Sequence, residues 1–199
     1  MSIEDRYLTL EKESTFEVKI ERSHFIGLAI PINGQDISEI LKETKSKFKN
    51  ATHYCYAYRK ITGEEYFSDG GEPTGTAGIP ILNVLREKDL HDIIGIVIRY
   101  FGGVKLGIRG LIDAYHYTMK KAIENSNIIE KVISEKYLLK TSYKDFNILK
   151  NEILKNFPCE IRENFLENVI LEVSIPLRYK ISFEDFINKR GIEIERNSQ

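Results

Sequence analysis

Two glycine-rich stretches of the chain carry residue types that could bind an anion. One runs from Ser68 to Gly78 and the other from Arg99 to Gly107, and each precedes a segment with the apolar spacing of a helix. Free backbone N–H groups at a helix N-terminus, together with the helix dipole, favour negative charge. We therefore interpret the loops as a binding site for phosphate, with the alternative that the glycines only turn the chain.

The candidate site combines cations, hydroxyl groups, glycines and polar residues at the rim. Its members are His53, Arg59, Asp69, Glu72, Thr74, Gly75, Thr76, Gly78, Arg99, Gly102, Gly103 and Lys105. Arg99 and Lys105 would supply positive charge for the phosphate, because charged donors form the stronger hydrogen bonds. The glycines would let the ligand reach the backbone, the threonines would add hydroxyl groups, and the other side chains would form the rim.

A catalytic alternative starts from Asp69 and Glu72, which lie three residues apart in the first loop. They could hold Mg²⁺, or act with His53 as a general base, in a small hydrolase of phosphorylated metabolites or nucleic acid. Neither loop has the Gly-Lys-Ser/Thr triplet of a P-loop or the Gly-x-Gly-x-x-Gly spacing of a dinucleotide-binding fold. The sequence favours a binding protein over an enzyme, with no cofactor and no metal ion.

Composition limits the kind of partner that the chain can attract. Lysine and arginine number 29 against 30 aspartate and glutamate among 199 residues, so any bound anion must be held by a local cluster. Hydrophobic residues make up 42% of the chain, which is enough for a globular core. There is no long apolar run, no signal peptide and no close pair of cysteines, so we expect a cytoplasmic protein without a membrane partner.

The elements that must position the loops can be predicted from apolar periodicity. Alternation predicts a hairpin over residues 15–30, and helical spacing follows from Ile37 to Phe48. Two short strands are predicted at 54–58 and 64–67, and a helix begins near Ile79. The continuous apolar run 93–98 indicates a strand buried on both faces, and a helix is expected over about 109–125.

The second half of the chain shows a different order of elements. Strands are predicted at 134–141, 159–166, 169–175 and 191–195, with helices at 143–156 and 182–190. The order is β-α-β-β-α-β, which is ferredoxin-like. We therefore predict an α+β protein of two domains, residues 1–130 and 131–199, that separate after the polar segment Asn125-Ser126-Asn127.

Three ordered motifs identify a family resemblance. They are Arg99-Tyr100-Phe101-Gly102-Gly103-x-Lys105-Leu106-Gly107, the loop from Glu72 to Gly78, and His53-x-Cys55-x-Ala57-Tyr58-Arg59. Together they closely resemble the IMPACT family in its bacterial, YigZ-type form. Residues from about 14 to 127 resemble the IMPACT N-terminal domain, and those from about 131 onward resemble the small C-terminal domain of the bacterial members.

The resemblance implies both a fold and a function. It implies a first domain with the β-α-β fold shared by a small-subunit ribosomal protein and elongation factor G, and a second similar to the last, ferredoxin-like domain of that factor. Such domains recur in translation, so the resemblance implies a regulator of translation that binds RNA or a ribosome-associated partner through the glycine-loop face. A metal-dependent hydrolase and a protein-interaction module remain the alternatives.

The sequence departs from the family pattern at two places. The family usually has a second aspartate where Gly70 stands. It also has a glycine followed four residues later by an arginine where this sequence has Arg109 and Asp113. The second departure brings positive charge to the start of the helix, so the anion-binding interpretation survives with a different arrangement of arginines.

Overall fold

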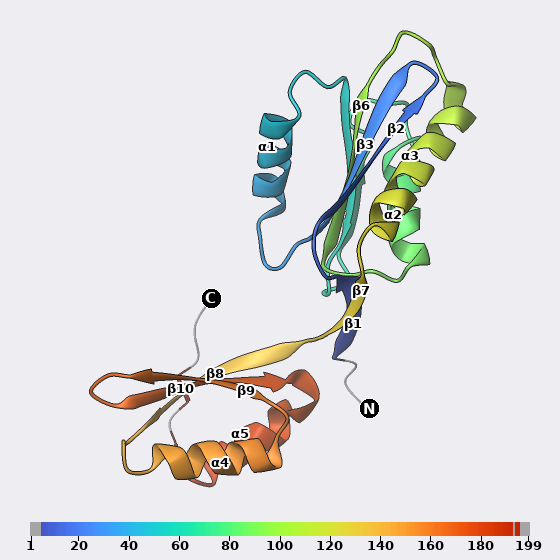
Figure 1. The fold of residues 1–199 in the computed structure, drawn as a ribbon. Helices are drawn as coiled ribbons and strands as arrows, with labels where there is room; N and C mark the ends of the chain where they lie inside the picture. The colour runs from blue at the N-terminus through green and yellow to red at the C-terminus, as the bar shows by residue number, and fades with distance from the viewer. Residues whose placement is uncertain (1–4, 193, 196–199) are drawn as a thin grey trace. The chain divides into compact units, whose positions relative to one another are not determined.

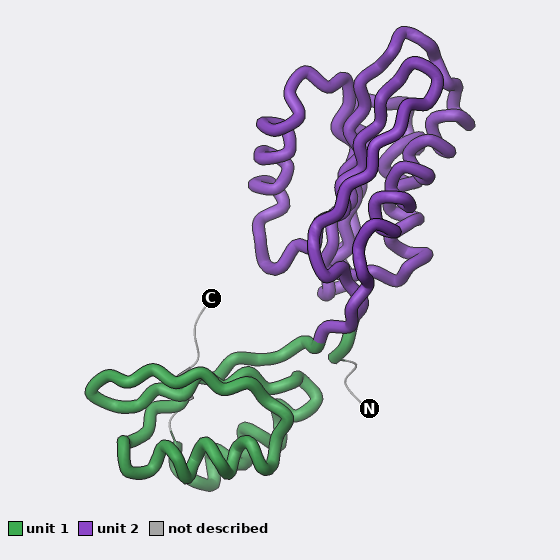
Figure 2. The backbone as a smooth tube through the Cα atoms, in the orientation of Figure 1, with its two compact units in different colours: residues 1–6, 132–199 green, residues 7–131 purple. Residues whose placement is uncertain are grey.

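The computed structural model describes residues 5–192, 194 and 195, and it combines helices with antiparallel sheets (Figure 1). This confirms the predicted α+β class. The chain forms two compact units (Figure 2). One comprises residues 7–131, and the other takes in residues 132 onward together with Asp5 and Arg6. The predicted boundary at residue 130 left these two N-terminal residues in the first domain.

The first unit is built on a five-stranded antiparallel sheet with the order β2-β3-β6-β4-β5. The strands are β2 (Ser14–Ile20), β3 (Ser23–Pro31), β4 (His53–Arg59), β5 (Glu65–Ser68) and β6 (Ile93–Tyr100). In the register, Tyr100 pairs with His24 and Arg99 pairs with His53. The end of β6 therefore lies beside the beginnings of β3 and β4, and we call this end of the sheet the loop end (Figure 1).

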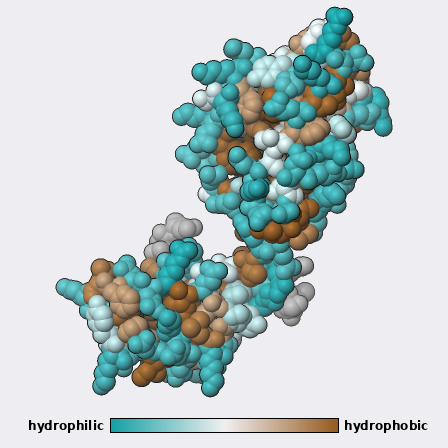
Figure 3. Space-filling model, in the orientation of Figure 1, coloured by the Kyte–Doolittle hydropathy of each residue, from teal (hydrophilic) through white to brown (hydrophobic). Residues whose placement is uncertain are grey.

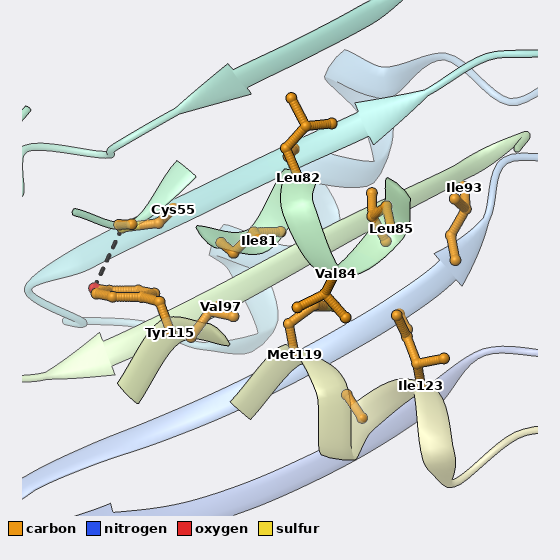
Figure 4. Packing of buried hydrophobic residues seen from close by; sticks show 14 of the residues in the cluster. Cys55, Ile81, Leu82, Val84, Leu85, Ile93, Val97, Tyr115, Met119 and Ile123 are labelled. Atoms are coloured by element: carbon orange, nitrogen blue, oxygen red, sulfur yellow. Dashed lines mark hydrogen bonds between the residues drawn. The ribbon is translucent and has the colours of Figure 1, made fainter. Parts of the chain in front are cut away.

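Helices cover both faces of this sheet (Figure 1). They are α1 (Ile37–Lys47), α2 (Gly78–Glu87) and α3 (Gly107–Glu124). On the face covered by α2 and α3, Ile93 and Val97 of β6 belong to one core with Tyr115 and Met119 (Figure 4). The alternate β6 residues belong to the core that includes Ile40 of α1. Strand β6 is thus buried on both faces, as its continuous apolar run predicts.

Two further strands were not predicted. β1 (Arg6–Leu10) and β7 (Ile128–Val132) form a separate two-stranded sheet. Each has only five residues, and the pairing joins segments more than a hundred residues apart in sequence. No local pattern indicates such a long-range pairing, because both segments are short and no turn motif joins them as it would in a hairpin.

The second unit has the predicted β-α-β-β-α-β order. Its elements are β8 (Ser134–Thr141), α4 (Phe146–Asn156), β9 (Glu160–Phe165), β10 (Val169–Pro176), α5 (Lys180–Asn188) and β11 (Ile194–Glu195), with a short 3₁₀ helix at Leu177–Tyr179. The sheet order is β11-β8-β10-β9. Its apolar core is separate from those of the first unit.

Polar side chains dominate the face of the molecule drawn in Figure 3. Within the described residues, no helix is both long enough and apolar enough to cross a membrane.

Candidate functional site

A cleft at the loop end brings the two glycine loops into one site. It has a volume of about 420 Å³ and lies between the end of β6, the start of β4 and the start of α3. Its lining comprises Thr52, His53, Gly71, Glu72, Pro73, Arg99, Phe101, Lys105, Leu106, Gly107, Ile108 and Leu111. The structure thus places four of the predicted side chains, those of residues 53, 72, 99 and 105, around one cavity.

Arg99 and Glu72 form a buried ion pair at this cleft. The guanidinium Nη1 donates to Glu72 Oε1 at 2.6 Å, and the two side chains are 5% and 3% exposed. Arg99 occupies an inward-facing position of β6, where strand alternation directs its side chain toward the core. Glu72 neutralises the charge of Arg99, so the prediction that Arg99 offers free charge to a phosphate is wrong.

The rest of the Arg99 guanidinium is packed among aromatic rings. Its central carbon, Cζ, lies 5.3 Å from the ring centroid of Phe25 and 5.2 Å from that of Phe101. Nη2 donates to the hydroxyl of Ser23 at 3.1 Å. Nε is buried and has no hydrogen-bond partner in the described part of the chain. Buried donors nearly always have partners, so this nitrogen stands out.

His53 lies close to two residues of the first loop, Gly70 and Glu72. The distance between its Nδ1 and the carbonyl oxygen of Gly70 is 3.1 Å, and since that oxygen only accepts, Nδ1 carries the proton. Nε2 lies 3.8 Å from Glu72 Oε1, and the side chain is 19% exposed. His53 therefore presents Nε2 at the rim of the cleft, where it was predicted.

Behind Glu72, a chain of polar contacts runs into the core. Tyr115 donates its hydroxyl proton to Glu72 Oε1 at 2.8 Å, and the thiol of Cys55 donates to the Tyr115 oxygen at 3.3 Å (Figure 4). Burial raises the pKa of the Cys55 thiol to about 12, and burial also raises the pKa of Tyr115. Both groups stay protonated at neutral pH. This series of hydrogen bonds therefore holds Glu72 in place and supplies no nucleophile.

Asp69 has a structural role that the sequence analysis missed. One carboxylate oxygen, Oδ2, accepts from the Gly75 amide at 2.8 Å. The other, Oδ1, accepts from the amides of Ala77 at 3.0 Å and Gly78 at 2.8 Å. These are the donors at the start of α2, so Asp69 is the anion that the first loop binds. The predicted roles of Gly75 and Gly78 as free donors for a ligand are therefore wrong.

The same geometry engages both carboxylates proposed for a metal ion in contacts within the protein. Asp69 is used by three backbone amides, and Glu72 is used by Arg99 and Tyr115. Among the described residues, no group of three or more histidine, cysteine, aspartate or glutamate side chains could hold a metal ion. The Thr76 hydroxyl donates to the Pro73 carbonyl, whereas Thr74 is exposed outside the cleft lining.

Arg59 lies at the opposite end of β4 from His53, about 20 Å along the strand at the usual rise per residue. Its Nε donates to Glu65 at 2.6 Å and its Nη1 donates to the Leu90 carbonyl at 3.1 Å. The prediction that Arg59 lies at the rim is wrong, because a seven-residue strand separates it from the loops.

The second loop leaves the start of α3 open. Gly102 packs against the Arg22 backbone, where a Cβ atom would lie 1.7 Å from the carbonyl oxygen. Gly103 and Gly107 have positive φ angles of 85° and 73° with open space around them. The N-cap residue Leu106 makes no side-chain hydrogen bond to the helix. Unlike α2, helix α3 therefore begins without a carboxylate cap from any described residue.

Free cations surround the open loop. Lys105 is exposed, and so are Arg22 in the β2–β3 turn and Lys49 in the loop after α1. None of the three has an ion-pair partner among residues 5–192, 194 and 195. Arg22 adjoins Gly102, and the Lys49 carbonyl accepts from the Tyr100 hydroxyl at 3.2 Å. The sequence analysis missed Arg22 and Lys49 because strand pairing, rather than any motif, brings them to the loop end.

Comparisons with known proteins match the same region. The family model of the Impact N-terminal domain covers residues 21–123, which is just over half of the chain. The chain belongs to the IMPACT family. The IMPACT family member YvyE of Bacillus subtilis is 31% identical over 92% of this chain and 86% of its own length. YigZ of Escherichia coli is 28% identical over 79% of this chain and 80% of its own length.

The fold extends over the whole IMPACT-type chain. The crystal structure of a hypothetical protein matches over 99% of this chain and 100% of its own chain, with a TM-score of 0.69 at 24% identity. That likeness shows a shared fold.

This IMPACT family chain also differs locally from the pattern expected for its family. A Cβ atom at Gly70 would lie 2.3 Å from the Tyr54 carbonyl oxygen, so the expected aspartate does not fit this loop conformation. Arg109 is 86% exposed and its Nε lies 3.0 Å from Asp113 in the next turn of α3. Arg109 is thus paired on the helix surface and outside the cleft lining.

Proposed function

We propose that this IMPACT family protein is a translation-associated regulator that binds RNA through the loop end of its first unit. The observation that carries the proposal is the open cleft lined by Lys105, with Arg22 and Lys49 exposed on neighbouring loops and none of the three paired with a carboxylate of the described residues. Phosphate contacts supply most of the affinity of proteins for nucleic acid. Of the predicted phosphate ligands, Lys105 keeps its role, and Arg22 and Lys49 take the place of Arg99.

The electrostatics of the chain favour a small footprint on RNA. With 29 cationic and 30 anionic side chains, the protein has no long-range field to gather nucleic acid. Three cations on adjacent loops would contact about three phosphates. A plot of the logarithm of the binding constant against the logarithm of the salt concentration should then have a slope of about −2 to −3. Such binding is weak alone and needs either a specific pocket or a ribosome-associated surface.

We also infer the finer organisation of the chain. The β-α-β-β-α-β order and the separate core of the second unit support an independent ferredoxin-like domain beside the IMPACT N-terminal-type domain. We also infer that the protein is cytoplasmic, as a role in translation requires. The hydrolase alternative loses its support because Asp69 and Glu72 are both engaged within the protein.

The test is the binding of a fluorescent RNA stem–loop. We expect the triple variant Arg22→Gln, Lys49→Gln, Lys105→Gln to lose at least tenfold in affinity at low salt and to flatten the salt dependence, because counterion release is lost with each phosphate contact. The matched control changes three exposed lysines of the second unit, Lys140, Lys155 and Lys189, to glutamine.

The two triple variants have equal net charge, so a nonspecific charge effect would weaken both alike. A loss confined to the loop-end variant supports the proposal. If neither variant changes RNA affinity, the binding face lies elsewhere. If the natural chain binds no RNA at all, the proposed function falls and a protein-interaction module becomes the better description.

A further inference from the structure

We propose that the loop-end cleft holds one unpaired nucleotide of RNA, with its base against Phe101 and its phosphate at the start of α3. This inference rests on the proposed RNA-binding function and specifies which part of the RNA the protein recognises. A volume of about 420 Å³ lies in the range of pockets for single small ligands. It suits one nucleotide rather than a length of duplex.

Phe101 provides a held aromatic surface for the base. Phe101 is 44% exposed and forms part of the cavity wall. Its amide donates to the Thr52 hydroxyl at 3.0 Å, and the Arg99 guanidinium lies 5.2 Å from the ring centroid. Leu106 and Ile108 extend the apolar wall. Bases stack on such rings whatever their sequence, but only when the base is unpaired and accessible.

The phosphate would meet the start of α3. The N-cap Leu106 leaves the first-turn amides without a side-chain acceptor, whereas Asp69 fills this role for α2 and Asp36 for α1. Lys105 stands next to these amides as an exposed cation, and Gly107 itself lines the cleft. Helix N-termini with a nearby cation bind phosphate groups readily.

A second, independent observation points to a ligand in this cleft. Arg99 lines the cavity with a side chain only 5% exposed, and its Nε has no acceptor in the described part of the chain. A buried donor beside a cavity is most simply satisfied by an acceptor atom that enters the cavity. The edge of a nucleotide base carries carbonyl and ring-nitrogen acceptors that can reach such a donor.

The experiment compares a blunt RNA duplex with the same duplex carrying one extra, unpaired nucleotide. We expect the natural protein to bind the bulged duplex about tenfold more tightly, because stacking of one base on an aromatic ring contributes on that scale. Phe101→Leu should remove most of this difference, and Phe101→Tyr should restore it. The matched control is Phe165→Leu, which changes a 50% exposed phenylalanine of the second unit.

The outcomes separate this inference from the proposed function. Equal binding of both duplexes, together with an unaltered Phe101→Leu variant, overturns the single-nucleotide site while stem–loop binding through the loop-end cations stands. Competition by free adenosine or uridine monophosphate as tight as the bulged RNA would identify free nucleotide as the source and overturn the RNA assignment. Because Phe101 is nearly half exposed, we expect Phe101→Leu to fold normally. An unchanged thermal melt of the variant checks this.

Discussion

At the scale of single residues, the buried pair of Arg99 and Glu72 is the feature that the sequence motif conceals. The motif presents Arg99 as a cation beside a glycine loop, which favours a phosphate ligand. The structure turns its side chain into the core, where Glu72 and two aromatic rings surround it. The role of Arg99 is thus to hold the first loop against the end of β6.

We predict that Arg99→Met lowers the free energy of unfolding by about 3–5 kcal/mol, because it leaves the Glu72 carboxylate buried without its cationic partner. Urea denaturation measures the change. Adding Glu72→Gln to this variant should recover part of the loss, since the unpaired charge is then gone. If the two single effects simply sum in the double variant, the ion pair has no coupling energy and this description fails.

The Cys55 thiol gives a second prediction at this scale. With its pKa raised to about 12 by burial, about 1 in 10⁴ of the thiols is ionised at pH 8. Iodoacetamide should therefore leave Cys55 unmodified in the folded protein and label it fully in urea, as read by mass spectrometry. The half-buried Cys159 is the internal comparison. Equal labelling of both thiols in the folded state would contradict the burial of Cys55.

At the scale of elements, the Asp69 cap of α2 occupies the backbone amides of the first glycine loop. Three amides of this loop and helix start donate to one carboxylate. We predict that Asp69→Ala lowers the free energy of unfolding by about 2 kcal/mol, at the upper end for an N-cap. Asp36→Ala is the control, because Asp36 is the ordinary N-cap of α1 and accepts from the Ser38 amide at 2.6 Å, and we expect about 1 kcal/mol there.

Thermal or urea unfolding compares the two cap variants. A smaller loss for Asp69→Ala than for Asp36→Ala would mean that the three hydrogen bonds of Asp69 do not add to the stability of the loop.

Most elements follow from the sequence because their apolar spacing is local. The β2–β3 hairpin, the doubly buried β6 and the order of the second unit are all predicted in this way. The roles of Asp69 and Arg99 are harder to predict. Asp69 caps a helix that begins nine residues later, and this spacing matches no local capping motif. For Arg99, strand alternation along β6 indicates that the side chain points inward.

At the scale of the whole molecule, Asp5 belongs to the second unit although it precedes the first unit in the sequence. The Asp5 carbonyl accepts from the Ile133 amide at 2.7 Å, and its carboxylate accepts from Arg178 Nε at 2.8 Å. The Asp5 side chain is only 3% exposed. Burial acts to raise the pKa of this carboxyl, but the hydrogen bonds from Arg178 outweigh it and leave the pKa below its ordinary value.

This lowered pKa predicts a pH dependence of stability. A carboxyl with a lower pKa in the folded than in the unfolded chain stabilises the fold above pH 3.8, and that contribution disappears as the pH falls through the folded value. We expect Asp5→Asn to cost about 1 kcal/mol at pH 7 and much less at pH 3. Thermal unfolding at both values measures it, with Asp185→Asn as an exposed control. Equal losses at both pH values would exclude this role for Asp5.

The contact between Asp5 and Arg178 also orders the folding of the chain during its synthesis. These partners are 173 positions apart, so the first of them leaves the ribosome long before the second has been made. The five-stranded sheet and the three helices of the first unit lie within residues 14–124, so that unit can fold while translation continues. The second unit cannot form this contact until Arg178 has been made, so Asp5 stays without this partner until then.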